Sequence, residues 1–180
     1  MSRITADYLR YLFKNGDGFV TLAEEIDHVG DYMQIQKMRY VDALRYETDI
    51  DGQAALVRIP PMTIQTFVEN SIKHALTLEG EVLVRVDARV EKIENEPRAV
   101  ITIRDTGSGF DPQVLSQLIN QGSVRGKDGS GVGIDNCLKR LHHYYGGKAS
   151  VSFQNAPEGG AVVIICLPLS ICEKGGAQLP

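Results

Sequence analysis

Two pairs of predicted strands that are adjacent in the sequence constrain the fold of this chain most strongly. The pairs are residues 82–86 and 99–103 around the polar turn 94–97, and residues 148–154 and 161–167 around the turn 156–160. Neighbouring strands joined by a short turn are typical of antiparallel hairpins. A further strand, over 43–50, alternates apolar and polar residues. With amphipathic helices between these strands, the order favours an α/β (α+β) two-layer sandwich over a doubly wound fold: a mixed, mostly antiparallel sheet with helices on one face.

Three amphipathic helices are predicted between the strands. Thr21 is a candidate N-cap and Glu24 completes a capping box, so the first helix should run from there to about Arg39. The residues expected near its inner side are Leu22, Ile26, Val29, Met33, Gln36 and Met38. The second helix is marked by Pro60-Pro61, since proline is tolerated in a first turn, and the third follows Gly133.

The remaining segments are expected to be less regular. Residues 110–130 should form a loop with at most one or two helical turns around 114–119. Residues 4–14 have the pattern of a short amphipathic helix, and residues 173–180 that of a loose tail.

Composition excludes several classes of protein. The 180 residues can fill one core, and a net charge of −4 gives no general electrostatic argument for binding nucleic acid. Neither a signal peptide nor an apolar run of bilayer length is present, and three cysteines without metal-ligand spacing suit a reducing compartment. We therefore expect a soluble, cytoplasmic chain.

The first candidate binding motif is Asp105-Thr106-Gly107-Ser108-Gly109, at the end of a predicted strand. Its glycines permit close approach of a flat ligand. A partly buried Asp105 carboxylate needs hydrogen-bond donors, and an exocyclic amine such as that of adenine would supply one. The alternative is a common Asp-Gly turn after a strand.

The second motif is Gly129-Ser130-Gly131-Val132-Gly133, which opens the third helix. Free N–H groups at a helix start, together with the helix dipole, can bind phosphate oxygens. The spacing matches neither the dinucleotide fingerprint nor a Walker loop. A flexible loop with a helix cap is the alternative interpretation.

The third motif lies on the second helix, where Asn70, Lys73 and His74 share a polar face. An amide oxygen of Asn70 could coordinate Mg²⁺, which takes few protein ligands, and the other two side chains could contact phosphates. A solvated polar stripe is the alternative.

The order and spacing of the three motifs resemble the N, G1 and G2 boxes of the GHKL family of ATPases and kinases, which have the Bergerat ATP-binding fold. Residues 59–74 look like the N box of the LytS/YesM group of bacterial sensor histidine kinases, and 19–25 and 32–39 resemble the linker of that group. The resemblance covers about residues 5–168.

This resemblance implies roles for individual residues. Asp105 would bind the adenine of ATP, Asn70 the Mg²⁺ ion, and Lys73 and His74 the phosphates. The residues implied to line the nucleotide are Gly107 and Gly109 in the first glycine motif and Gly129, Gly131, Val132 and Gly133 in the second. Arg125 and Lys127, in the segment that corresponds to the ATP lid, are candidates for γ-phosphate contacts or are solvated loop charges. Glu69 either supports metal-bound water or is structural.

The chain departs from the family pattern in three places. Thr66 stands where some GHKL hydrolases carry a water-activating glutamate, which counts against a hydrolase. Ala161 stands where relatives often have a hydroxyl near the adenine. The phosphoacceptor histidine motif is expected upstream of this chain, because His28, His142 and His143 lie in predicted helices without its context.

The resemblance implies an ATP-binding catalytic domain of a two-component sensor histidine kinase. It would transfer the γ-phosphate of ATP to a histidine on an upstream domain, for relay to a response regulator. We expect residues 1–18 to end a dimerisation hairpin, 19–40 to form a linker helix, 41–172 the ATP-binding domain and 173–180 a tail. The intact protein should be a homodimer, attached to a membrane only through a missing N-terminal part. The alternatives are a non-catalytic nucleotide-sensing module and an anti-sigma-type serine kinase.

Overall fold

A computed structural model of the protein describes residues 18–40, 43–75, 80–121 and 132–169. Its main sheet has five strands in the order β2-β4-β5-β7-β6, in which β2 and β4 are parallel and all other neighbours antiparallel. The strands are β2 (Leu44–Ile50), β4 (Val82–Ile93), β5 (Glu96–Asp105), β6 (Ser150–Asn155) and β7 (Ala161–Pro168). The predicted mixed, mostly antiparallel sheet is confirmed.

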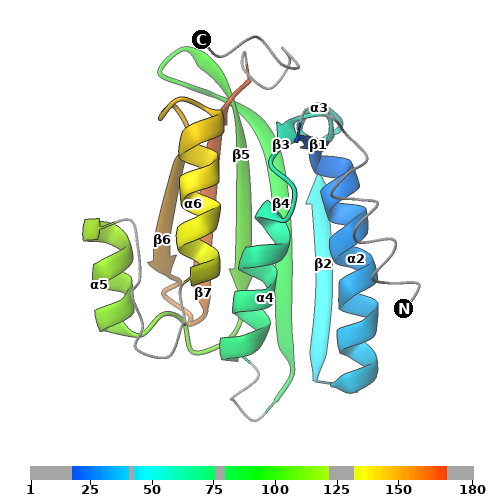
Figure 1. The fold of residues 1–180 in the computed structure, drawn as a ribbon. Helices are drawn as coiled ribbons and strands as arrows, with labels where there is room; N and C mark the ends of the chain where they lie inside the picture. The colour runs from blue at the N-terminus through cyan, green and yellow to red at the C-terminus, as the bar shows by residue number, and fades with distance from the viewer. Residues whose placement is uncertain (1–17, 41–42, 76–79, 122–131, 170–180) are drawn as a thin grey trace.

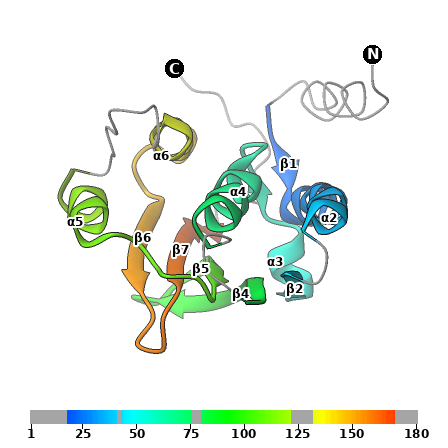
Figure 2. The ribbon, with the colours of Figure 1, turned by 90° about the horizontal axis from the view of Figure 1, so that it is seen from below.

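The three long helices cover one face of this sheet, as Figures 1 and 2 show. They are α2 (Leu22–Arg39), α4 (Thr63–Ala75) and α6 (Val132–Tyr144), and α5 (Pro112–Gln121) lies beside β6. The remaining described elements are the short helix α3 (Gly52–Ala55) and a small antiparallel strand pair, β1 (Val20–Thr21) with β3 (Arg58–Ile59). The predicted two-layer sandwich is therefore confirmed.

The core fills the space between the sheet and these helices. On α4 the apolar stripe Ile64, Val68, Ile72 and Ala75 is buried, as predicted, against inward residues of β4 and β5 such as Val84 and Ile103. Burial of this stripe, rather than helix propensity, stabilises α4, because a 13-residue helix is marginal on its own.

The capping box of α2 is also confirmed. The Thr21 hydroxyl accepts from the Glu24 backbone N–H at 3.2 Å, and Thr21 N donates back to Glu24 Oε2 at 2.9 Å. The expected inner position of Met38 is wrong, since 74% of that residue is exposed at the end of the helix. Glu25, which was not expected inside, is completely buried instead.

Two further segments are longer than predicted. The strands β4 and β5 extend to a two-residue turn, Glu94-Asn95, in which both residues have positive φ, 54° and 65°. Helix α5 has ten residues rather than one or two turns, because Asp111 caps it by accepting from Gln113 N at 2.8 Å. The predicted helix over 4–14 and the tail over 173–180 lie outside the described residues, and the domain boundaries stay a prediction.

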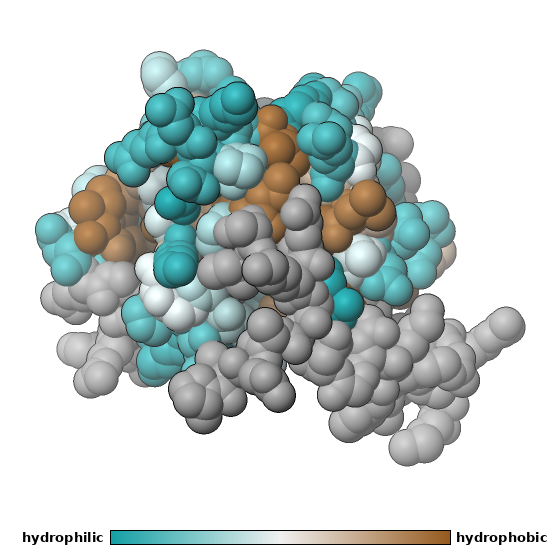
Figure 3. Space-filling model, turned by 90° about the horizontal axis from the view of Figure 1, so that it is seen from above, coloured by the Kyte–Doolittle hydropathy of each residue, from teal (hydrophilic) through white to brown (hydrophobic). Residues whose placement is uncertain are grey.

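The hairpin turn and the first turn of α2 lie at the same end of the molecule (Figure 1). Seen from that end, in Figure 3, the surface is mostly hydrophilic, with smaller hydrophobic areas between the polar side chains. Asp105 lies at the other end of β5, ten residues from the turn.

Candidate nucleotide-binding site

Asp105 is held in a fixed orientation where β5 ends. It is 3% exposed, and its Oδ1 accepts from Gly107 N at 2.9 Å and from Ala161 N at 3.1 Å. Within the described part of the chain, no donor bonds to its Oδ2. A buried carboxylate with one satisfied and one available oxygen is an acceptor site for a ligand N–H group.

Two glycines allow this arrangement. A Cβ on Gly107 would lie 2.5 Å from the Cβ of Ala75, so the glycine lets α4 pack on the turn. A Cβ on Gly160, whose φ is +92°, would lie 1.9 Å from the carbonyl oxygen of Asp105. Gly160 therefore lets the start of β7 approach the end of β5, which brings Ala161 N to the carboxylate.

A side chain of β6 fixes the segment that follows the glycine turn. Asn155 Oδ1 accepts from Phe110 N at 2.7 Å, and Asn155 Nδ2 donates to Phe110 O at 3.0 Å. The Phe110 ring then packs edge-on against Phe153, with 5.8 Å between the ring centroids. This segment forms one wall of a pocket.

The pocket lies beside Asp105 and between α4, the glycine turn and the start of α6. Its lining residues are Asn70, Ser71, His74, Ala75, Asp105, Ser108, Gly109, Phe110, Asp111, Val114, Ile134 and Ala161. One half of this set is apolar and the other carries amide, imidazole, hydroxyl and carboxylate groups. Such a mixture suits a ligand with a flat apolar part and a polar part.

Helix α4 contributes Asn70 and His74, one turn apart on the same side. Asn70 is half-buried. Partial burial lowers the pKa of His74, the positive charge of Lys73 lowers it further, and Asp105 opposes them. The neutral imidazole is thus favoured, so His74 can donate or accept a hydrogen bond in the pocket.

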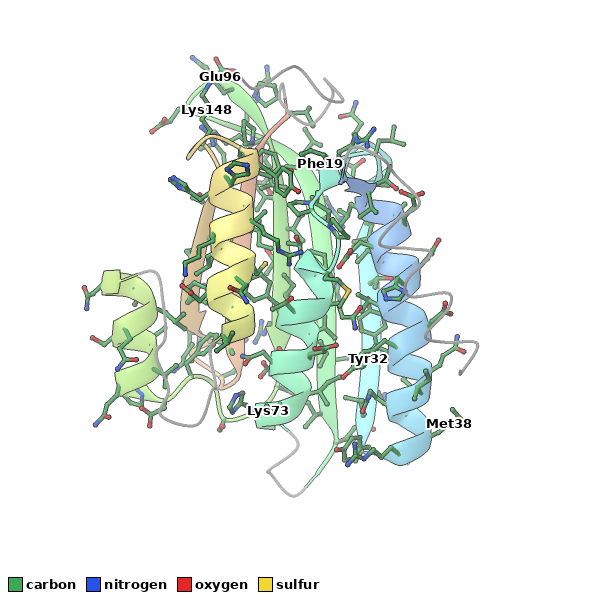
Figure 4. All side chains as sticks on the ribbon, in the orientation of Figure 1. Phe19, Tyr32, Met38, Lys73, Glu96 and Lys148 are labelled. Atoms are coloured by element: carbon green, nitrogen blue, oxygen red, sulfur yellow. The ribbon has the colours of Figure 1, made fainter. Side chains whose placement is uncertain are left out.

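The structure places two other predicted residues of α4 away from this lining. Glu69 accepts from Gln65 Nε2 at 2.7 Å. Its carboxylate is thus bonded to another residue of α4 and is not part of the pocket lining. The pKa of Tyr32 on α2 is raised to about 12, mainly because Tyr32 is partly buried and secondly because of the negative charge of Glu69. Lys73 is exposed near the end of α4 (Figure 4).

The second glycine motif is described only in part. Val132 and Gly133 form the first turn of α6, next to the pocket-lining Ile134. A Cβ on Gly133 would be 3.6 Å from Thr66 Cγ2, so this turn lies against the first part of α4, one turn before Asn70. The N–H groups of a helix start thus lie close to the Asn70 side of α4, in a position suited to anions. Gly129, Gly131, Arg125 and Lys127 lie outside the described residues.

Sequence reasoning missed several members of the site. Phe110, Asp111 and Val114 belong to a segment expected to be a loop. The sequence Asp111-Pro112 was a usable signal, because Asp is a preferred N-cap and Pro a preferred first residue of a helix. The main-chain role of Ala161 has no such signal, since any residue other than proline could supply the N–H.

In the ranges that the structure describes, no group of three or more His, Cys, Asp or Glu side chains is arranged to hold a metal ion. Nor does any helix in those ranges combine the length and the apolar character that crossing a membrane requires.

Comparisons with known proteins agree with this geometry. Residues 61–171 match the family model described as histidine kinase-, DNA gyrase B- and HSP90-like ATPase, and residues 1–44 match a model described as histidine kinase. The sensor protein LytS of Staphylococcus haemolyticus is 36% identical over 143 residues, which cover 79% of this chain and 24% of LytS. The predicted resemblance to the LytS/YesM group is confirmed. The chain spans about a quarter of the length of the curated relatives that it matches.

Solved structures share the fold at low sequence identity. The catalytic domain of the histidine kinase ThkA superposes with a TM-score of 0.58 at 17% identity, over 83% of this chain and 93% of that one. Full-length ShkA in complex with AMPPNP gives a TM-score of 0.58 at 17% identity, over 83% of this chain and 30% of ShkA. Since the family model matches well over half of its residues, the chain belongs to the family of histidine kinase-, DNA gyrase B- and HSP90-like ATPases.

Proposed function

We propose that this chain is the ATP-binding catalytic domain of a two-component sensor histidine kinase. The observation that carries the proposal is the carboxylate of Asp105, whose Oδ1 is bonded to Gly107 N and Ala161 N while its Oδ2 is left for a ligand. The adenine 6-amino group is a donor of the required kind. Apolar pocket residues such as Val114 and Ile134 would pack on the base.

The polar half of the pocket suits a triphosphate. The neutral imidazole of His74 and the helix start at Val132 and Gly133 offer N–H donors to phosphate oxygens. ShkA, which shares the fold, was solved with the ATP analogue AMPPNP. That complex supports nucleotide binding by this fold.

The donor set also fits Mg²⁺. Asn70 is the pocket residue of α4 with a neutral amide oxygen, and Mg²⁺ in nucleotide sites takes few protein ligands besides phosphates and water. A bound Mg²⁺ would neutralise charge on the phosphates. Asn70 would orient that ion, and Lys73 would contribute positive charge from the exposed end of α4.

Transfer to a histidine is better supported than transfer to water. The hydroxyl of Thr66 donates to Met62 O at 2.6 Å, and the carboxylate of Glu69 is engaged by Gln65. Neither is arranged to deprotonate water in the pocket. A neutral imidazole needs no such base, because it is itself a good nucleophile. The role of this chain would then be to bind and orient the nucleotide and exclude water from it.

The partners follow from the same proposal. The acceptor would be a histidine on the upstream dimerisation domain of the same protein, which would be a homodimer, and the next acceptor an aspartate of a response regulator. By analogy with LytS, a sensor protein about three times as long, the chain would be a cytoplasmic domain of a membrane-anchored receptor.

The test is a transfer experiment with two polypeptides. This chain is mixed with a separately produced segment of the intact protein that carries the candidate acceptor histidine, in the presence of Mg²⁺ and γ-labelled ATP. We expect acid-labile label on the segment, and no label when its histidine is replaced by alanine. Nucleotide binding without label would instead favour the nucleotide-sensing alternative.

A further inference from the structure

The start of α4 has no local cap. The residues before it are Pro60, Pro61 and Met62, and Met62 has a positive φ of 66°, a conformation that costs energy for a residue with a side chain. The first backbone N–H groups of a helix have no partner inside the helix. In a buried position they must find acceptors elsewhere.

Glu25 of α2 supplies those acceptors from 37 to 40 residues away. Its Oε2 accepts from Met62 N at 2.9 Å, and its Oε1 accepts from Ile64 N at 3.1 Å and from Gln65 N at 3.2 Å. The whole residue is buried. A carboxylate at this place also matches the positive end of the helix dipole.

The same two helices are neighbours beyond the Glu25 bonds as well. Tyr32 lies seven residues after Glu25, and the charge of Glu69 acts on its hydroxyl. Helices α2 and α4 run side by side in the same direction, with Tyr32 between them (Figures 1 and 4). The bonds of Glu25 thus set the position of α4 along α2 at the start of the helix, about two turns before Asn70.

The capping contact also connects two parts of the chain. Glu25 lies in residues 1–44, which match the histidine kinase model, whereas α4 lies in residues 61–171, which match the ATPase model. At the start of α2, β1 pairs with β3, and Phe19 packs edge-on against Tyr144 with 4.6 Å between the ring centroids. The residues just before α2 are thus attached to the rest of the domain by a strand pair and a ring contact, a few residues before Glu25.

We propose that Glu25 is a positioning residue for the nucleotide site, fixing the first turn of α4 and hence Asn70, two turns later, relative to α2. The inference rests on the proposed function, because it assumes that Asn70 holds the metal ion of a bound nucleotide. Replacement of Glu25 by glutamine places an amide N–H₂ against one of the backbone donors. The first turn of α4 must then shift, while Asp105, on a different element, keeps its bonds.

The experiment compares Glu25→Gln with Asp31→Asn, which removes the same charge from an exposed position on α2. Binding of AMPPNP is measured by calorimetry with Mg²⁺ and with EDTA, at a temperature well below the unfolding midpoint of each variant. We expect Glu25→Gln to weaken the Mg²⁺-dependent binding about 10-fold, as loss of a residue that orients a metal ligand does, and to leave binding in EDTA unchanged. Asp31→Asn should match the wild-type protein in both conditions.

Backbone amide NMR signals of Ile64 and Gln65 show whether the capping bonds are lost. If these signals move in Glu25→Gln while Mg²⁺-dependent binding equals that of the wild type, Glu25 only stabilises the fold and the inference is wrong. Should Glu25→Gln not fold, Glu25→Asp, which keeps the charge on a shorter side chain, decides by the same comparison. Failure of the wild-type chain to bind AMPPNP at all would instead refute the nucleotide-binding proposal itself.

Discussion

Gly160 and Asp105 are so close that a Cβ on Gly160 would lie 1.9 Å from the Asp105 carbonyl oxygen. This approach brings the next residue, Ala161, to the Asp105 carboxylate. The geometry of the Asp105 carboxylate, to which we assign adenine binding, thus depends on a glycine that is 55 residues away in the sequence and belongs to the turn of another hairpin.

Replacement of Gly160 by alanine should therefore destabilise the fold and impair nucleotide binding together. The clash and the positive φ should lower the free energy of unfolding by about 3 kcal/mol. The matched control is Gly146→Ala, which also has a positive φ but has no atoms within 4 Å of the added Cβ. Urea unfolding should show a smaller loss, about 1 kcal/mol, for the control. Equal losses for the two variants would mean that the close approach to Asp105 costs nothing.

Asp105→Asn should weaken AMPPNP binding about 100-fold, as measured by calorimetry. The asparagine oxygen would stay with Gly107 N and Ala161 N, so its N–H₂ group would face the amino group of adenine. Asp87→Asn removes the same charge from the uncovered face of the sheet, where Asp87 pairs with Arg85, and should bind like the wild type. If Asp105→Asn binds AMPPNP as tightly as the wild type does, the assignment of adenine binding to Asp105 is wrong.

His74 should titrate below its ordinary pKa of 6.5, because burial and then Lys73 disfavour its charged form. As the pH falls from 6.5 toward the folded-state pKa, the unfolded chain takes up the proton first, so His74 makes folding less favourable in that window. NMR titration of the imidazole of His74 measures this value directly. In Lys73→Gln the value should rise but stay below 6.5, since burial is the larger cause. A midpoint unaffected by that substitution would place Lys73 out of electrostatic contact with His74.

The turn at Glu94-Asn95 should accept a more favourable sequence. Both residues have positive φ, which a two-residue hairpin of this kind requires and which Asn-Gly adopts most readily. The double variant Glu94→Asn with Asn95→Gly should raise the free energy of unfolding by about 1 kcal/mol. AMPPNP affinity should not change, because the turn is at the far end of β5 from Asp105. Lower stability would show that the present residues make contacts beyond the turn.

The sequence predicted the parts of the fold that local patterns encode. The capping box of Thr21 and Glu24, the buried stripe of α4 and the two hairpins all follow from residue spacing. The ends of β4 and β5 were misjudged because the hairpin extends beyond the helical layer, where its residues are exposed and lose the apolar alternation. Helix α5 was underestimated although Val114, Leu115, Leu118 and Ile119 have helical spacing, and although Asp111 and Pro112 marked its start.

Contacts between distant segments could not be predicted in this way. Glu25 lies in the stripe of Leu22, Val29 and Met33, where a charge is unexpected unless a partner is known. That partner is a set of main-chain N–H groups on another helix, which leaves no mark in the side-chain sequence. The resemblance to GHKL proteins indicated Asp105 and Asn70, yet it did not reveal that the carboxylate of Glu69 bonds to Gln65.

The paired bonds between Asn155 and Phe110 have a consequence for how the protein is made. When the ribosome has synthesised the chain as far as Gly147, α4, the Asp105 turn and α6 are present, but Asn155 and Ala161 are not. The wall at Phe110 and the second donor to Asp105 exist only once the last hairpin has been added. Under the proposed function, nucleotide affinity should therefore appear only after this hairpin has been synthesised. A protein that ends before β6 should fail to bind ATP even though the three motifs that indicate ATP binding are present.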